Sequence, residues 1–202
     1  MVSAERDVEP PGRAARTSPA RVVVGLLIAV IIIAGSWFVG GRQGFDQVGR
    51  GGINRVLLPK VGEAAPDLVA LEAGDKVVTL SQFRGQPVWL NFWGSWCPPC
   101  RSEMPEMQAA YERLQPQGLV LMAVSLDESV DDAVSYAKLN GATYEVAADP
   151  YRKGTAAYPI ANFPTHILID REGIVRDIVL AELNEEQFVE RAAAILGPDG
   201  TS

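Results

Sequence analysis

Two cysteines separated by two residues, Cys97 and Cys100, are the side chains of this sequence best suited to covalent chemistry. A β-prone apolar run, Val88 to Trp93, ends at Gly94, and a segment rich in helix formers begins just past Cys97. A strand that leads directly into a helix would place Cys97 at the helix N-terminus, where unpaired N–H groups and the helix dipole favour an anion. A thiolate is the anion that attacks disulfides, so this stretch predicts a site of thiol–disulfide exchange.

The two sulfurs are expected to have different roles. Cys97 precedes the helix, so it should be the more exposed and more acidic sulfur and act as the nucleophile. Cys100 lies one turn inside the helix and should be the buried resolving thiol. Exchange would run through a mixed disulfide between Cys97 and the substrate, which Cys100 breaks by attacking Cys97.

A C-x-x-C pair has two other readings, half of a zinc site and a static disulfide. Zinc needs four ligands, and the rest of the chain has no further cysteine and one histidine, His166. Closing so short a loop removes little chain entropy from the unfolded state, so a purely structural disulfide is also a poor explanation. We therefore expect no metal and no cofactor at this site.

The segments around the pair alternate between strand and helix patterns. The predicted strands are Val88 to Trp93, Leu119 to Ser125, Tyr144 to Ala147, Thr165 to Asp170 and Ile174 to Leu180, and the predicted helices are Pro99 to Leu114, Val130 to Leu139, a short one near Arg152 to Tyr158, and Glu185 to Leu196. Ahead of them, Pro66 to Leu71 and Lys76 to Leu80 flank a turn-rich segment and predict a hairpin. Strands interleaved with helices predict an α/β sheet that is covered on both faces.

Three motifs together resemble one known family. The stretch LNFWGSWCPPCRSEMPEM, the earlier VGEAAPDLVAL and the later FPTHILIDREG are similar, in this order, to landmarks of the membrane-anchored thioredoxin-like proteins of the TlpA/ResA type. The match covers roughly Val61 to Leu196. It implies a thioredoxin fold over residues 61–198, a central mixed sheet with helices on both faces, with the hairpin as an N-terminal addition.

The helix after the cysteines carries two further features of interest. Pro98 and Pro99 lack an N–H, so two possible donors to a Cys97 thiolate are absent, which favours a reductant over an oxidant. Glu103 shares a helical face with both cysteines and is either a dipole-capping glutamate or a proton acceptor. Asn91 stands where similar thioredoxins carry a buried aspartate, and in the TlpA/ResA type a glutamate matching Glu103 is associated with the active site.

The resemblance also implies a substrate groove. Pro164 matches the family's cis-proline, whose loop packs beside the C-x-x-C and offers backbone groups to a bound peptide. Phe163 and Pro164 would form one wall of the groove, together with Trp96 and Pro98. His166 is expected to be a satisfied or solvent-facing histidine with no part in catalysis.

The N-terminal part has a different composition. Residues 1–21 mix both charges with prolines and predict a disordered tail. Residues 22–39 contain no charge and would form about 27 Å of helix, enough for a transmembrane anchor, with a cleaved signal peptide and a buried soluble helix as the alternatives. The glycine-rich residues 40–60 predict a flexible tether.

The function expected from these features is that of a membrane-anchored, single-pass thiol–disulfide oxidoreductase with its catalytic domain outside the cytoplasm. The resemblance implies disulfide-containing protein substrates, such as apocytochrome c or copper-site assembly proteins. We also expect a membrane-embedded electron donor and a monomer, and the net charge of −7 gives no basic surface for nucleic acid. Two alternatives are a thiol peroxidase of the thioredoxin fold and a copper-binding assembly factor using Cys97, Cys100 and His166.

Overall fold

The structure, a computed structural model, describes residues 23–30 and 58–197. The chain divides into two units, Met1–Asp46 and Gln47–Ser202. In the first unit, residues 23–30 form a helix with exposed side chains, and no helix within the described ranges is long and apolar enough to cross a membrane. The predicted tail at 1–21 and the greater part of the predicted anchor (22–39) and tether (40–60) fall outside the described residues.

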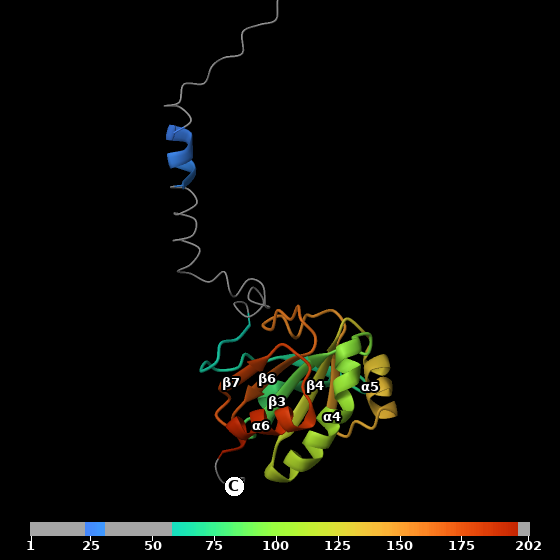
Figure 1. Cartoon of the computed structure of the whole chain (residues 1–202). Helices are drawn as coiled ribbons and strands as arrows, with labels where there is room; N and C mark the ends of the chain where they lie inside the picture. The colour runs from blue at the N-terminus through green and yellow to red at the C-terminus, as the bar shows by residue number, and fades with distance from the viewer. Residues whose placement is uncertain (1–22, 31–57, 198–202) are drawn as a thin grey trace, which may run out of the picture. The chain divides into compact units, whose positions relative to one another are not determined.

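One mixed sheet of seven strands organises the second unit, in the order β2-β1-β5-β4-β3-β6-β7 (Figure 1). Its strands are β1 (Val69–Glu72), β2 (Lys76–Thr79), β3 (Val88–Trp93), β4 (Val120–Leu126), β5 (Glu145–Asp149), β6 (Thr165–Ile169) and β7 (Val175–Val179), and its helices are α4 (Pro98–Leu114), α5 (Val130–Leu139) and α6 (Glu185–Leu196), with the 3₁₀ turns η1 (Leu80–Phe83) and η2 (Gln115–Gln117). Strands β5, β4 and β3 are parallel, and the outer strands pair antiparallel. The thioredoxin-like α/β fold with an N-terminal hairpin is confirmed, and the hairpin extends the sheet through β1 beside β5.

The three α-helices of this unit lie on one face of the sheet, not on both faces as predicted. The chain steps from β3 to β4 and then from β4 to β5 in the same direction across the sheet. Right-handed crossovers in one direction put their helices on the same face, so α5 joins α4 there, and α6 packs beside α4. Figure 1 shows α4 and α6 side by side in front of the strands. The opposite face is covered by segments without an α-helix, which contribute Leu58, Leu80, Tyr158 and Ile160 to its core.

The predicted short helix at residues 152–158 is wrong, because this segment consists of turns and bends. The carboxylate of Asp149 accepts hydrogen bonds from the backbone N–H groups of Lys153 (3.2 Å) and Thr155 (2.8 Å). Arg152 adopts a positive φ of 52°. A side chain that captures these N–H groups offers the backbone an alternative to a helix, and a left-handed residue interrupts one.

The N-terminal segment of the unit is tied to its C-terminal hairpin. Gly62 N–H donates to the carbonyl of Val175 at 2.8 Å, Val175 N–H donates to Glu63 at 2.9 Å, and Ala65 N–H donates to Gly173 at 2.9 Å. Leu58 is buried in the same core although it lies within the predicted tether. The packed region therefore begins by Leu58, ahead of the expected boundary at residue 61.

Strand β3 explains why the site is held rigidly. All six of its residues are buried, which the sequence pattern predicted for a central strand covered on both sides. Trp89 and Trp93 face the helices, whereas Leu90 and Phe92 face the opposite core. The strand ends directly before the turn that precedes the cysteines.

Candidate active site

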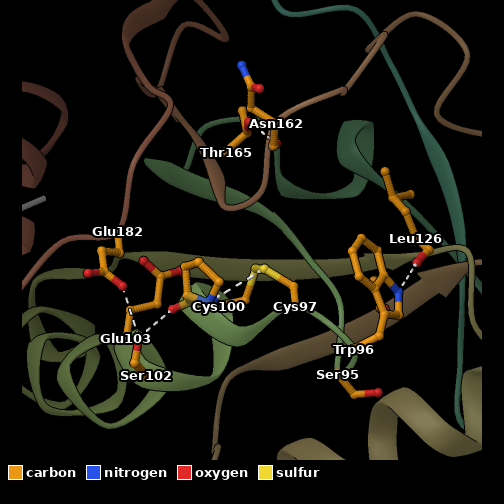
Figure 2. The surroundings of a disulfide bond; sticks show 12 residues. Ser95, Trp96, Cys97, Cys100, Ser102, Glu103, Leu126, Asn162, Thr165 and Glu182 are labelled. Atoms are coloured by element: carbon orange, nitrogen blue, oxygen red, sulfur yellow. Dashed lines mark hydrogen bonds between the residues drawn. A yellow bond between two sulfur atoms is a disulfide. The ribbon is translucent and has the colours of Figure 1, made fainter. Parts of the chain in front are cut away.

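The Cys97–Cys100 pair lies where the sequence predicts it, at the N-terminus of α4. The two cysteines form a disulfide with their Cα atoms 5.3 Å apart. Cys97 is the N-cap residue of the helix, and its sulfur accepts a hydrogen bond from the backbone N–H of Cys100 at 3.3 Å. Figure 2 shows the disulfide between Trp96 on one side and Glu103 on the other.

The expected difference in exposure between the two cysteines is wrong. Cys97 is 3% exposed and Cys100 is 2% exposed, and both belong to the core cluster beneath the helices. Phe163 packs against this cluster from the loop before β6. What distinguishes the two sulfurs is their position on the helix, because only Cys97 occupies the N-cap.

The two prolines between the cysteines occupy the first positions of α4, which begins one residue before the predicted start at Pro99. Proline is well suited to this turn, because its missing N–H would be unpaired there in any case. Among the described residues, the N–H of Cys100 is the hydrogen-bond donor that reaches the Cys97 sulfur. A Cys97 thiolate formed on reduction of the disulfide would therefore have few donors.

The predicted groove residues gather beside the disulfide. Trp96 is 47% exposed, its indole N–H donates to the carbonyl of Leu126 at 3.1 Å, and its ring meets that of Phe163 edge to face at 4.9 Å. The Phe163–Pro164 peptide bond is cis, as the resemblance implied. Pro98 is exposed and Phe163 half-buried, but Pro164 is buried, so its side chain is not an open wall of the groove.

A carboxylate that the sequence analysis missed fixes the turn before Cys97. Glu128 accepts hydrogen bonds from the Ser95 N–H (2.8 Å), from the Ser95 hydroxyl and from the hydroxyl of Ser125 on β4. The contact joins residues more than thirty positions apart, so no local sequence signal predicts it. It holds the end of β4 and the active-site turn together.

A second missed feature is an ion pair beside the groove. The Arg152 guanidinium lies 5.4 Å above the ring of Phe163 and donates to both carboxylate oxygens of Asp127. The hydrogen bond from Arg152 lowers the pKa of Asp127 against a smaller opposing effect of burial. The pair supports the aromatic side of the groove.

Glu103 is not the exposed capping residue that one reading of the sequence expected. It is 2% exposed, and its Oε2 accepts from the backbone N–H of Leu183 at 3.3 Å and lies 3.3 Å from Nε2 of His166. Its Oε1 is buried without a hydrogen-bond partner among the described residues. Burial, and secondly the charge of Glu103, raises the pKa of nearby Tyr144.

His166 is not solvent-facing, because its ring is completely buried, and it is satisfied only in part, because its Nε2 has no hydrogen-bond partner among the described residues. Its Nδ1 accepts from the Trp89 indole N–H at 3.2 Å and lies 3.1 Å from the amide nitrogen of Asn91. The residue therefore belongs to a polar cluster with Glu103 behind the disulfide. Within the described ranges, no group of three or more His, Cys, Asp or Glu residues could hold a metal ion.

Comparison with known proteins gives the family of this chain. A sequence profile of the AhpC/TSA family matches residues 61–178, more than half of the chain. The chain belongs to the AhpC/TSA family. The thiol–disulfide oxidoreductase ResA of Geobacillus thermodenitrificans is 34% identical over 135 residues, which cover 67% of this chain and 78% of the relative.

Two solved structures have the same fold. A protein of Chlorobium tepidum described as a thiol:disulfide interchange protein DsbE is 34% identical, with a TM-score of 0.59 over 68% of this chain and 99% of its own. A secreted thiol-disulfide isomerase of Corynebacterium glutamicum is 28% identical, with a TM-score of 0.57 over 69% of this chain and 84% of its own. This AhpC/TSA protein is accordingly an enzyme, a thiol–disulfide oxidoreductase of the ResA/DsbE type.

The two alternative functions agree less well with this site. A copper site built on Cys97, Cys100 and His166 would need the three side chains in one group, but within the described ranges no such group exists, and the ring of His166 is completely buried with Nδ1 accepting from Trp89. A peroxidase needs a single peroxidatic thiol in its own motif, whereas here Cys97 follows Trp-Gly-Ser-Trp and pairs with Cys100.

Proposed function

We propose that this protein is a membrane-anchored, extracytoplasmic reductase of disulfides in partner proteins, such as apocytochrome c or copper-site assembly proteins. The observation that carries the proposal is the Cys97–Cys100 disulfide at the N-cap of α4, next to the exposed ring of Trp96. A membrane-embedded donor would return electrons to the pair. Trp96, Pro98 and Phe163 would contact the substrate, with the backbone of Pro164 available for strand-like pairing.

Two observations support the proposed location. Residues 22–39 carry no charge over about 27 Å of potential helix, which suits a membrane anchor. One relative of known structure is described as secreted, and protein disulfides persist in oxidising compartments outside the cytoplasm. Labelling of single cysteines introduced at residues 5 and 60, in a Cys97→Ser/Cys100→Ser background, with a membrane-impermeant reagent tests it. Labelling of residue 60 alone is expected, and the reverse pattern would reject the orientation.

The direction of the reaction follows from the few donors near Cys97. A thiolate that receives one hydrogen bond is less stabilised than one in a strongly oxidising relative, so the dithiol should be a better reductant. The midpoint potential of the pair is expected near that of thioredoxin, about −270 mV. A value near about −120 mV would identify an oxidant and reject the proposal.

The proposed reaction uses both cysteines and one proton acceptor. The Cys97 thiolate attacks a substrate disulfide, forms a mixed disulfide and releases the first substrate thiolate, which takes a proton from water. Glu103 then removes the proton of the Cys100 thiol, and the Cys100 thiolate attacks Cys97. The mixed disulfide breaks, the second substrate thiolate leaves, and the Cys97–Cys100 disulfide forms with two electrons transferred to the substrate.

Trapping of the mixed disulfide tests this order of events. Cys100→Ser nearly preserves volume but cannot displace sulfur, so it should accumulate covalent complexes under non-reducing conditions, whereas Cys97→Ser should not. Mass spectrometry of the trapped partner would identify the substrate. Equal trapping by both variants would refute the assignment of the nucleophile, and no trapping by a variant that still attacks model disulfides would refute a protein substrate.

A further inference from the structure

The cluster behind the disulfide contains a histidine whose tautomer is fixed by its neighbours. An indole N–H can only donate, so Nδ1 of His166, at 3.2 Å from Trp89 Nε1, must accept. The same nitrogen faces the Asn91 amide nitrogen at 3.1 Å. A proton on Nδ1 would oppose both donors, so the proton of the neutral ring lies on Nε2.

The protonated nitrogen lies beside the carboxylate of Glu103. Nε2 lies 3.3 Å from Oε2, and both side chains are almost completely buried. Leu183 N–H approaches the same oxygen at 3.3 Å. Oε2 therefore accepts one hydrogen bond, from the segment before α6, and lies beside the imidazole of β6, while Oε1 has no partner among the described residues.

Unpartnered polar atoms are rare in a protein core because each one loses its hydrogen bonds to water. Here Oε1 of Glu103 and Nε2 of His166 both lack a well-aligned hydrogen bond within the described ranges. Glu103 lies on the helix that carries Cys100, and His166 lies beside it on β6, so we infer that the energetic cost of these unpartnered atoms is retained for the reaction. An oxygen without a partner is free to accept a proton.

We propose that His166 is a positioning residue for the exchange reaction. Held in the Nε2–H tautomer by Trp89, it fixes Oε2 of Glu103 and leaves Oε1 to take the proton from the Cys100 thiol. The inference rests on the proposed proton transfer to Glu103. In the balanced step the Cys100 S–H bond breaks, an O–H bond forms on Oε1, and the proton later leaves to water.

The other groups near Glu103 do not replace this role. Burial raises the pKa of Tyr144, so its hydroxyl stays neutral. Glu106 and Glu182 line a hollow of about 290 Å³ against Glu103, where Glu182 accepts from the Ser102 hydroxyl. These residues face solvent and offer the proton an exit, and the neighbour of His166 on α6, Phe188, is apolar.

The tautomer can be measured directly, because His166 is the only histidine of the chain. Nitrogen-15 spectra of the histidine-labelled full chain should show the Nε2–H form, and Trp89→Phe should weaken that preference. A dominant Nδ1–H form would overturn the proposal without any variant that could fail to fold.

The functional test is a double-mutant cycle read as the pH profile of disulfide reduction by the full chain. His166→Leu removes the polar N–H group that lies 3.3 Å from Oε2, so the acid limb should move upward by about one pH unit, with about tenfold slower exchange on that limb. His166→Gln, which keeps an N–H donor, is the matched control and should shift less. In a Glu103→Gln background, His166→Leu should change the profile no further.

The outcomes separate this inference from the function on which it rests. An unaltered profile in Glu103→Gln would reject proton transfer by Glu103 itself. An altered profile in Glu103→Gln, combined with no shift in His166→Leu or with the same shift in both backgrounds, would reject the role of His166 alone.

Discussion

Glu128 offers a quantitative test of how the active-site turn is held. Its carboxylate accepts three hydrogen bonds, two from Ser95 and one from Ser125. At about 1 kcal/mol each for a half-buried group, Glu128→Ala should lower the free energy of unfolding by about 3 kcal/mol. Glu128→Gln keeps one carbonyl acceptor, and a serine hydroxyl can turn to accept from the amide, so its cost should be about 1 kcal/mol.

Urea unfolding measures the stability, and the rate of reduction of a protein disulfide measures the effect on the site. Ser95 lies two residues before Cys97, so a looser turn should also slow exchange, by about tenfold in Glu128→Ala. Glu190→Ala, at an exposed position on α6, is the matched control and should change stability by less than about 0.5 kcal/mol. If Glu128→Ala loses less than about 1 kcal/mol and exchanges at the normal rate, the carboxylate does not hold the turn.

Four other perturbations have expected outcomes. Deletion of Met1 to Gly41 should give a soluble, folded and active protein, and aggregation or lost activity would show a misplaced boundary. Trp96→Ala should raise KM for protein substrates with little change in Tm, because the ring is 47% exposed; an unchanged KM would remove it from the groove. The hydrogen bond from Arg152 holds the pKa of Asp127 below its usual 3.8, so the ion pair stabilises the fold above about pH 4, and this stabilisation is lost as the pH falls further. Arg152→Met should weaken this pH dependence in acid-unfolding curves. Phe188→Ala should cost about 3–5 kcal/mol in urea unfolding, because the ring is fully buried against Trp89, and a loss below about 1 kcal/mol would contradict that packing.

Much of the fold could be predicted because its signals are local. The period of apolar residues and the N-capping residues give α5 and α6 their predicted bounds, and the apolar run gives β3. The turn segment at 152–158 could not be predicted in the same way. Its composition allows a helix, but the Asp149 carboxylate captures the N–H groups, and this competition depends on the folded geometry.

Some residues of the active site likewise have local sequence signals, whereas others depend on contacts formed only in the folded protein. Cys97, Cys100 and Pro164 stand in short motifs whose spacing is visible in the sequence. Glu128 and Arg152 could not be found, because their contacts to Ser95 and Phe163 join separate segments of the chain. His166 was predicted to have no part in catalysis. Its burial against Trp89 and Glu103 depends on the pairing of β3 with β6, which the local sequence does not show.

The backbone contacts of residues 62–65 with residues 173–175 join a segment that is synthesised early to one that is synthesised late. The ribosome releases the N-terminal partner of this pairing more than a hundred residues before the C-terminal one. The core on the sheet face opposite the α-helices therefore cannot be completed during most of synthesis. Such distant pairing slows folding and leaves apolar surface exposed to aggregation in the meantime.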